Sequence, residues 1–219
     1  MGEFYQIKRK NNFNFNASIL LLIINVFCFI IFSISILFFP QFIDFIALKP
    51  SNIISNFYLW TFFTSMFMHG GFFHLFVNML SLVFVGNLSE KILGKKRFIL
   101  LYLFCGLFAG IFFVLSSFII PSDFNTYAVG ASGALFGLLG FLMIITPNLP
   151  VYMIFIPIPI KLKFAAPIML VMLWVISLAG NVPIGNVAHL GGFVIGLIYG
   201  FYLRKKYKHK VNYLGKYFS

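Results

Sequence analysis

The chain has 219 residues, of which 61% are hydrophobic and 9% are charged, and its formal net charge is +12. A soluble domain typically carries about 25% charged and about 45–50% apolar residues, so this composition excludes a water-exposed globular protein. It also excludes a disulfide scaffold, because Cys28 and Cys105 lie in apolar segments without metal-ligand spacing. The sequence predicts a polytopic membrane protein.

The positions of the basic residues indicate where the membrane segments lie. The Lys and Arg residues form short clusters, and long stretches between them contain no Asp, Glu, Lys or Arg: 11–43, 50–89, 98–122, 124–160 and 164–203. A membrane-spanning helix needs roughly 20 mainly apolar residues, so the longer stretches must include turns. Basic clusters at the ends of apolar segments argue against a nucleic-acid partner.

In chain order, these stretches predict six membrane-spanning helices in an all-α membrane protein. The predicted spans are 17–39, 69–88, 97–119, 131–146, 164–179 and 187–203. A less regular stretch at 50–68 precedes the second span, and four prolines predict a loop over 147–163. Gly, Asn and Pro residues predict a turn at 180–186, which is also a candidate gate or lid.

The orientation follows from the distribution of Lys and Arg, which favour short cytoplasmic loops. If the N-terminus is cytoplasmic, the inside segments hold 15 of the 16 basic residues and only Lys49 lies outside. The expected regions are a cytoplasmic basic N-terminus (1–16), a six-helix membrane domain (17–203) and a cytoplasmic basic tail (204–219). The first apolar run lacks a cleavage site, so we expect a retained helix rather than a signal peptide. The expected location is the plasma membrane of a prokaryotic cell.

Polar side chains at the outer ends of the predicted spans are candidates for a functional site, because ionisable groups inside a bilayer are costly. Ser132 opens the fourth predicted helix and His189 lies at the outer end of the sixth. His69 and His74 lie at the outer end of the second. A serine and a histidine at one depth on neighbouring helices are a candidate nucleophile and general base.

Glycine spacing supports a close approach of the fourth and sixth helices. These helices carry glycines at three- and four-residue spacing: Gly133, Gly137 and Gly140, and Gly192, Gly196 and Gly200. Small residues at this spacing let two membrane helices meet backbone to backbone, which would bring Ser132 to His189. Helix packing alone remains an alternative explanation of the glycines.

His74 and Asn78 are four residues apart and therefore lie on one face of a helix. Both donate hydrogen bonds, so together with the Ser132 N–H they are candidate ligands for a developing oxyanion. A hydrogen-bonded packing pair is the alternative. The acidic residues all fall in loops or at span ends, which favours a Ser/His dyad over a triad: Glu3, Asp44, Glu90 and Asp123.

Three sequence blocks resemble the signature of the rhomboid intramembrane serine proteases. They are Trp60 to Asn78, Gly130-Ala131-Ser132-Gly133, and Ala188-His189-Leu190-Gly191-Gly192 with Gly196. The blocks occur in the family's order and cover roughly 50–203. The resemblance implies a six-helix rhomboid-like bundle.

The resemblance also implies a role for each matching residue. Ser132 would be the nucleophile, His189 the general base and acid, and His74 and Asn78 would line the oxyanion hole with the Ser132 N–H. Supporting positions follow from the same blocks: Gly130, Gly133, Phe136 and His69. The implied activity is cleavage of single-pass transmembrane substrates near the outer face of the lipid bilayer, through an acyl-enzyme and without a metal or nucleotide cofactor.

The chain departs from the family pattern at two positions. Trp60 is followed by Thr61 where an Arg is usual, and Phe136 occupies a position where Tyr is common. Glu90 and Gly94 match the family's Glu-x-x-x-Gly turn, in which we expect Glu90 to pair with the neighbouring basic cluster, for example with Arg97.

Two other functional classes are compatible with a polytopic membrane protein. A catalytically silent rhomboid-like protein would bind membrane clients without cutting them, but such proteins typically lack the serine or the histidine. A small transporter would require paired charges near the midplane or two matching broken helices, and the sequence contains neither.

Overall fold

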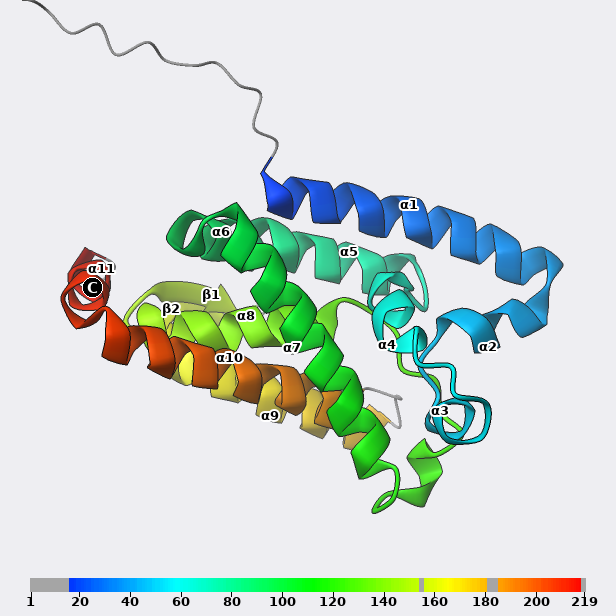
Figure 1. Ribbon diagram of the computed structural model, residues 1–219. Helices are drawn as coiled ribbons and strands as arrows, with labels where there is room; N and C mark the ends of the chain where they lie inside the picture. Colours follow the sequence, from blue (N-terminus) through cyan, green and yellow to red (C-terminus); the bar gives the residue numbers. More distant parts are fainter. Residues whose placement is uncertain (1–15, 154–155, 181–184, 218–219) are drawn as a thin grey trace, which may run out of the picture.

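The computed structural model describes residues 16–153, 156–180 and 185–217, and these residues are mostly helical (Figure 1). The longer helices are α1 (Ala17–Phe38), α5 (Phe72–Ser81), α6 (Asn87–Leu93), α7 (Lys95–Ser116), α8 (Ser132–Ile145), α9 (Leu162–Gly180), α10 (Asn186–Lys206) and α11 (Lys208–Tyr217). Short helices occupy the stretch after α1: α2 (Ile43–Ile46), α3 (Pro50–Asn56) and α4 (Thr61–Thr64). Single 3-10 turns lie at Pro40–Phe42, Ser65–Phe67 and Pro121–Asp123.

Five helices in the described part of the chain are long and apolar enough to cross a membrane. They are α1, the continuous helix Phe72–Leu93, α7, α9 and α10. The remaining predicted span, 131–146, corresponds to α8, which has 14 residues. The second helix begins at Phe72 rather than at 69, because Gly70 and Gly71 precede it in non-helical conformation, and it ends before Gly94, whose φ is +77°.

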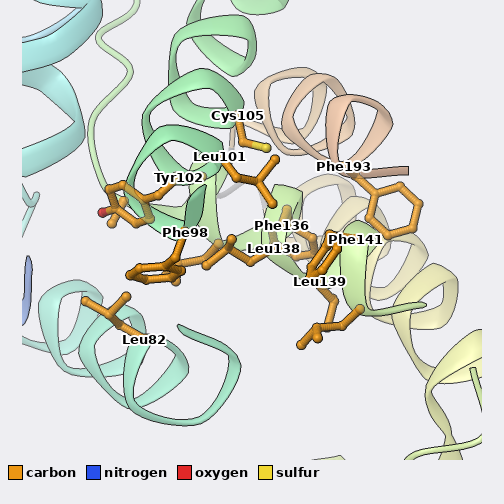
Figure 2. Packing of buried hydrophobic residues seen from close by; sticks show 14 of the residues in the cluster. Leu82, Phe98, Leu101, Tyr102, Cys105, Phe136, Leu138, Leu139, Phe141 and Phe193 are labelled. Carbon is orange, nitrogen blue, oxygen red and sulfur yellow. The ribbon is translucent and has the colours of Figure 1, made fainter. Parts of the chain in front are cut away.

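The helix Phe72–Leu93 is interrupted by a π-helical turn, Leu82–Gly86, which joins α5 to α6. Such wide turns are rare and accommodate one residue more than an α-helical turn. Leu82 in this turn is fully buried and belongs to the same cluster of side chains as Phe98 of α7 (Figure 2). The turn therefore lies at a tightly packed point of the bundle.

Helix α8 is the centre of the structure. All its residues except Ser132 and Met143 are buried, as expected for a helix that is apolar on every side. It packs mainly against α10 and α7, and Figure 2 shows side chains of these helices interlocking around it: Phe136, Leu138, Leu139 and Phe141 with Leu101, Cys105 and Phe193.

Glycines allow the backbones of α8 and α10 to touch. A Cβ atom on Gly192 would collide with the carbonyl oxygen of Gly133, and one on Gly196 would collide with that of Gly137. The close approach expected from the glycine spacing is therefore present. The contact runs along both helices, from Gly133 and Gly192 to Ile144 and Gly200, and this alignment sets which residues meet at their ends.

Glu90 holds the start of α1. Its carboxylate accepts hydrogen bonds from the Ala17 and Ser18 backbone N–H groups at 2.7 and 2.8 Å and from the Ser18 hydroxyl at 2.8 Å. Of the basic cluster that follows Glu90, Lys95 interacts electrostatically with its carboxylate. The hydrogen bonds of the carboxylate go to α1, because the first N–H groups of a helix have no partner within the helix and carry partial positive charge.

The segment 147–163 is more regular than the predicted loop. Strands β1 (Pro150–Met153) and β2 (Ile156–Lys161) pair antiparallel. The prolines of this segment suit a two-stranded sheet, because a residue without N–H is tolerated where no further strand pairs with it. The prolines predicted a loop, whereas the Val and Ile residues between them favour strands.

The elements divide between two ends of the bundle (Figure 1). The beginning of α1, the end of α6, the β1–β2 hairpin and α11 lie at one end, whereas α2, α3 and α4 lie at the other. Most of the predicted gate, 180–186, and the N-terminal segment up to residue 15 lie outside the described residues.

The contact between α8 and α10 predicts a large effect of a single methyl group. Gly196→Ala should lower the free energy of unfolding by about 2 kcal/mol or more, because the added Cβ meets rigid backbone rather than a movable side chain. The measurement is the thermal midpoint in mild detergent. Gly185→Ala is the matched control, since its Cβ would make only an ordinary contact with Ala188; equal losses in both variants would contradict the packing explanation.

Candidate active site

Ser132 and His189 meet at the end of the α8–α10 contact. The distance between Ser132 Oγ and His189 Nε2 is 2.7 Å, which is a short hydrogen bond. Ser132 is the first residue of α8 and His189 lies in the first turn of α10. Both helices therefore present their N-terminal ends to the same point, where the partial positive charge of helix termini favours a developing negative charge.

His189 is buried and packs against Phe136. It is 8% exposed, and the Phe136 ring, one turn along α8 from Ser132, lies 4.8 Å away between centroids at an interplanar angle of 31°. This ring contact is present without the hydroxyl that a tyrosine at position 136 would supply. On the same side of the contact, Gly133 leaves room for Ala109 and for the Ala188 backbone.

His74 and Asn78 flank the backbone just before Ser132. A Cβ atom on Gly130 would lie 2.7 Å from His74 Nε2 and 3.4 Å from Asn78 Nδ2. Gly130 also has a φ of +112°, a conformation that side chains other than glycine rarely adopt. Only glycine fits both this backbone conformation and the space left by His74 and Asn78. A glycine at position 130 is therefore required for these side chains to lie against the backbone just before Ser132.

Two polar atoms of the site have no hydrogen-bond partner among the described residues, namely Asn78 Nδ2 and His189 Nδ1. Buried donors without a partner are costly, and Asn78 Nδ2 lies beside Gly130. An oxygen that develops negative charge next to Ser132 would satisfy such a donor. A serine hydroxyl, a histidine ring nitrogen and an amide donor without a partner therefore lie within one small region.

His69 lies beside His74 and outside the candidate spans. Its ring is 4% exposed and meets His74 edge-on, with centroids 5.2 Å apart. Burial and the neighbouring His74 lower the pKa of His69 to about 4. His69 is thus neutral near pH 7, and no contact to Ser132 or His189 is observed, in keeping with a supporting position.

The acidic residues are engaged elsewhere. Asp44 contacts Lys49, Asn52 and Tyr127 at the opposite end of the bundle from Glu90, while Glu90 holds α1. No carboxylate in the described part of the chain contacts His189 Nδ1, and Glu3 lies outside the described residues.

The contacts that hold the segment before Ser132 were not predicted from the sequence. The Gly130 N–H donates to the Ser65 carbonyl at 2.8 Å, and Tyr127 donates to Asp44 at 2.8 Å. Long-range pairings of this kind leave no local pattern. The one available signal was the presence of an acid, Asp44, and the isolated basic residue Lys49 in the same stretch between two apolar segments.

This chain is similar in sequence to known proteins. A family model described as the Rhomboid domain matches residues 56–206. RHOMBOID-like protein 1 of Arabidopsis thaliana is 39% identical over 160 residues, which are 71% of this chain and 37% of that protein. RHOMBOID-like protein 2 of the same plant is 38% identical over 160 residues, 72% of this chain and 46% of that protein.

A third similar protein is named as inactive. Inactive RHOMBOID-like protein 8 of Arabidopsis thaliana is 34% identical over 151 residues, which are 68% of this chain and 39% of that protein. The aligned part is less than half of the length of each of these relatives.

The buried position of His69 predicts a pH-dependent stability. The pKa of His69 is about 4 in the folded chain and about 6.5 in the unfolded chain. As the pH falls, the unfolded state therefore takes up a proton at this histidine before the folded state does. Stability should be complete above about pH 6.5 and should fall as the pH drops toward 4, by at most about 1.4 kcal/mol per pH unit. Thermal midpoints measured from pH 7 to pH 5 check this.

The matched comparison uses two histidines of different exposure. His69→Gln should flatten the pH dependence of the thermal midpoint, whereas His209→Gln on the exposed face of α11 should leave it unchanged. An equally steep dependence in wild type and His69→Gln would show that other groups are responsible.

Proposed function

We propose that this chain, which belongs to the rhomboid family and is a multi-pass membrane protein, is an intramembrane serine endopeptidase. Its substrates would be the transmembrane segments of single-pass membrane proteins, cut near the outer face of the membrane. The observation that carries the proposal is the 2.7 Å hydrogen bond between Ser132 Oγ and His189 Nε2. The approach of His74 and Asn78 to Gly130 supports it.

The chemistry needs only side chains of this chain, the substrate and water. His189 Nε2 takes the proton from Ser132 as Oγ bonds to the scissile carbonyl carbon, and the carbonyl oxygen becomes negative. His74, Asn78 and the Ser132 N–H would donate hydrogen bonds to that oxygen. His189 then gives its proton to the leaving amine, which produces an acyl-enzyme. Water, deprotonated by His189, then bonds to the acyl carbon, and the bond to Ser132 Oγ breaks as His189 returns the proton to that oxygen, which releases the acid.

The short length of α8 supports cleavage within the membrane. Its 14 residues extend about 21 Å, less than the bilayer's hydrocarbon thickness of about 30 Å. If the far end of α8 reaches one membrane surface, Ser132 lies below the other. A transmembrane substrate keeps its carbonyls hydrogen-bonded within its own helix, so small or helix-breaking residues near the cut would ease access.

The proposal includes a membrane topology. Six spans, with α8 as the fourth, would put both termini in the cytoplasm and the site near the outer face, and the clustering of Lys and Arg supports this orientation. The membrane domain would extend over 17–203, between the basic segments 1–16 and 204–219. The relatives compared above are plant proteins and give no support to the expected prokaryotic plasma membrane, which stays a prediction from sequence.

A catalytically silent, client-binding protein is the second candidate. This candidate is considered because the chain is similar to a relative that is named inactive. Against it stands the presence of both Ser132 and His189 in hydrogen-bond contact. Reactivity of Ser132 distinguishes the two candidates.

Labelling of purified protein with a serine-directed fluorophosphonate tests the nucleophile. We expect wild-type protein in detergent or liposomes to be labelled and to cleave a model transmembrane substrate. Ser132→Ala should abolish labelling, and His189→Ala should reduce labelling and cleavage by at least about 10³-fold, because the two residues act as a unit.

Two matched variants control for non-specific effects. Ser81→Ala removes a half-buried serine whose hydroxyl donates to Val77 of its own helix, and His209→Ala removes an exposed histidine of α11; both should behave as wild type. Labelling that survives in Ser132→Ala would refute the nucleophile. Wild-type protein that neither labels nor cleaves would favour the silent protein.

The proposed oxyanion donors predict a distinct kinetic signature. His74→Ala and Asn78→Ala should each lower kcat by about 10²–10³-fold with little change in KM, because their hydrogen bonds form in the transition state. Steady-state kinetics with a transmembrane substrate measure both constants. A change confined to KM would place these residues in substrate binding instead.

A further inference from the structure

The segment that leads into Ser132 is tied to the outer loop between α1 and α5. Leu48 and Ala128 exchange two backbone hydrogen bonds, at 3.2 and 2.8 Å. Further along the same segment, the Ser51 N–H donates to the carbonyl of Phe124 at 3.0 Å. After a turn at 124–125, the stretch 126–130 pairs with the outer loop through a single bridge at Ala128. This stretch, called here the strand before α8, is therefore held along one edge rather than being a free loop.

A cluster of polar side chains reinforces this edge. Asp44 Oδ1 accepts hydrogen bonds from the Tyr127 hydroxyl at 2.8 Å and from Asn52 Nδ2 at 2.9 Å. Lys49 Nζ lies 3.6 Å from the same oxygen and 4.9 Å from the centre of the Tyr127 ring. One carboxylate oxygen thus joins α2, α3 and the strand before α8.

The charge of Asp44 strengthens these bonds. Partial burial raises the pKa of the carboxyl, but the hydrogen bonds from Asn52 and Tyr127 and the positive charge of Lys49 outweigh it, so the pKa lies below its usual value. Asp44 is therefore ionised at neutral pH. Hydrogen bonds to an ionised acceptor are stronger than those between neutral groups.

Tyr127 is close to the site in sequence. It precedes Gly130 by three residues and Ser132 by five, and Gly130 lies directly against His74. A shift of the Tyr127 backbone is therefore carried to Gly130 and Ser132 through very few rotatable bonds. Small displacements of reacting groups have large effects on rate.

We propose that Asp44 is a positioning residue of the site: through Tyr127 it holds the strand 126–130 and so sets Gly130 and Ser132 relative to His74 and Asn78. The catalytic part of this inference rests on the proposed protease function. The structural part, that Asp44 immobilises the strand, does not depend on it.

The test is a double-mutant cycle of Asp44→Ala and Tyr127→Phe in the full-length protein. Each single variant should lower kcat by about tenfold while KM stays within twofold, because the strand moves but the substrate surface remains. The double variant should be no slower than the slower single variant, since both remove one interaction. Rates that multiply in the double variant, or a kcat within twofold of wild type in both singles, would overturn the proposal.

Conservative variants separate positioning from folding. Asp44→Asn keeps an oxygen that accepts from Tyr127 and should restore most of the lost kcat. Tyr58→Phe removes a hydroxyl of the same outer loop that is not part of the Asp44 cluster and should leave kcat unchanged. A loss in Tyr58→Phe equal to that in Tyr127→Phe would attribute the effect to general loosening of the loop.

Hydrogen exchange provides a readout that does not require activity. In Asp44→Ala and Tyr127→Phe, amides in peptides covering 124–131 should exchange several-fold faster at temperatures well below the thermal midpoint, while peptides from α8 exchange as in wild type. If wild-type protein fails to cleave or label, the proposed function fails, and exchange still decides whether Asp44 holds the strand. Unchanged exchange in 124–131 would overturn the inference.

Discussion

The backbone contact between α8 and α10 is the constraint on which the site depends. Lipid tails are as apolar as the helices, so burial of apolar surface does not drive helices together inside a bilayer, and close packing must do so. Glycines at Gly133, Gly137, Gly192 and Gly196 let the two backbones touch. That contact brings a serine and a histidine 57 residues apart in sequence to 2.7 Å. The meeting of these two polar residues thus depends on positions that carry no side chain.

The remaining parts of the site are held by polar contacts at the ends of helices. Glu90 holds the start of α1 at one end of the bundle, and Asp44 holds the strand before Ser132 at the other. A chain with only four acidic residues uses two of them as acceptors for groups far away in sequence. In an apolar environment, a few such bonds are specific because competing polar partners are scarce.

Much of the fold was predictable because apolar length and helix-breaking residues are local signals. The starts and ends of α1, α7, α8 and α10 follow from basic clusters, prolines and glycines, and the meeting of Ser132 and His189 follows from the glycine spacing. The β1–β2 hairpin, the Glu90 contact and the Asp44 cluster were not predictable. They depend on which segments are neighbours in space, and a single sequence does not contain that information for isolated polar residues.

The π-helical turn Leu82–Gly86 decides where the helix Phe72–Leu93 can change in length. Each residue of an α-helix advances the helix by about 100°, so the deletion of one residue between Glu90 and this turn would turn Glu90 away from α1. Within the turn, the loss of one residue would instead leave an ordinary α-helical turn, because a π turn holds one residue more than an α turn. The turn is therefore the point of this helix at which one residue can be lost while His74, Asn78 and Glu90 keep their facing.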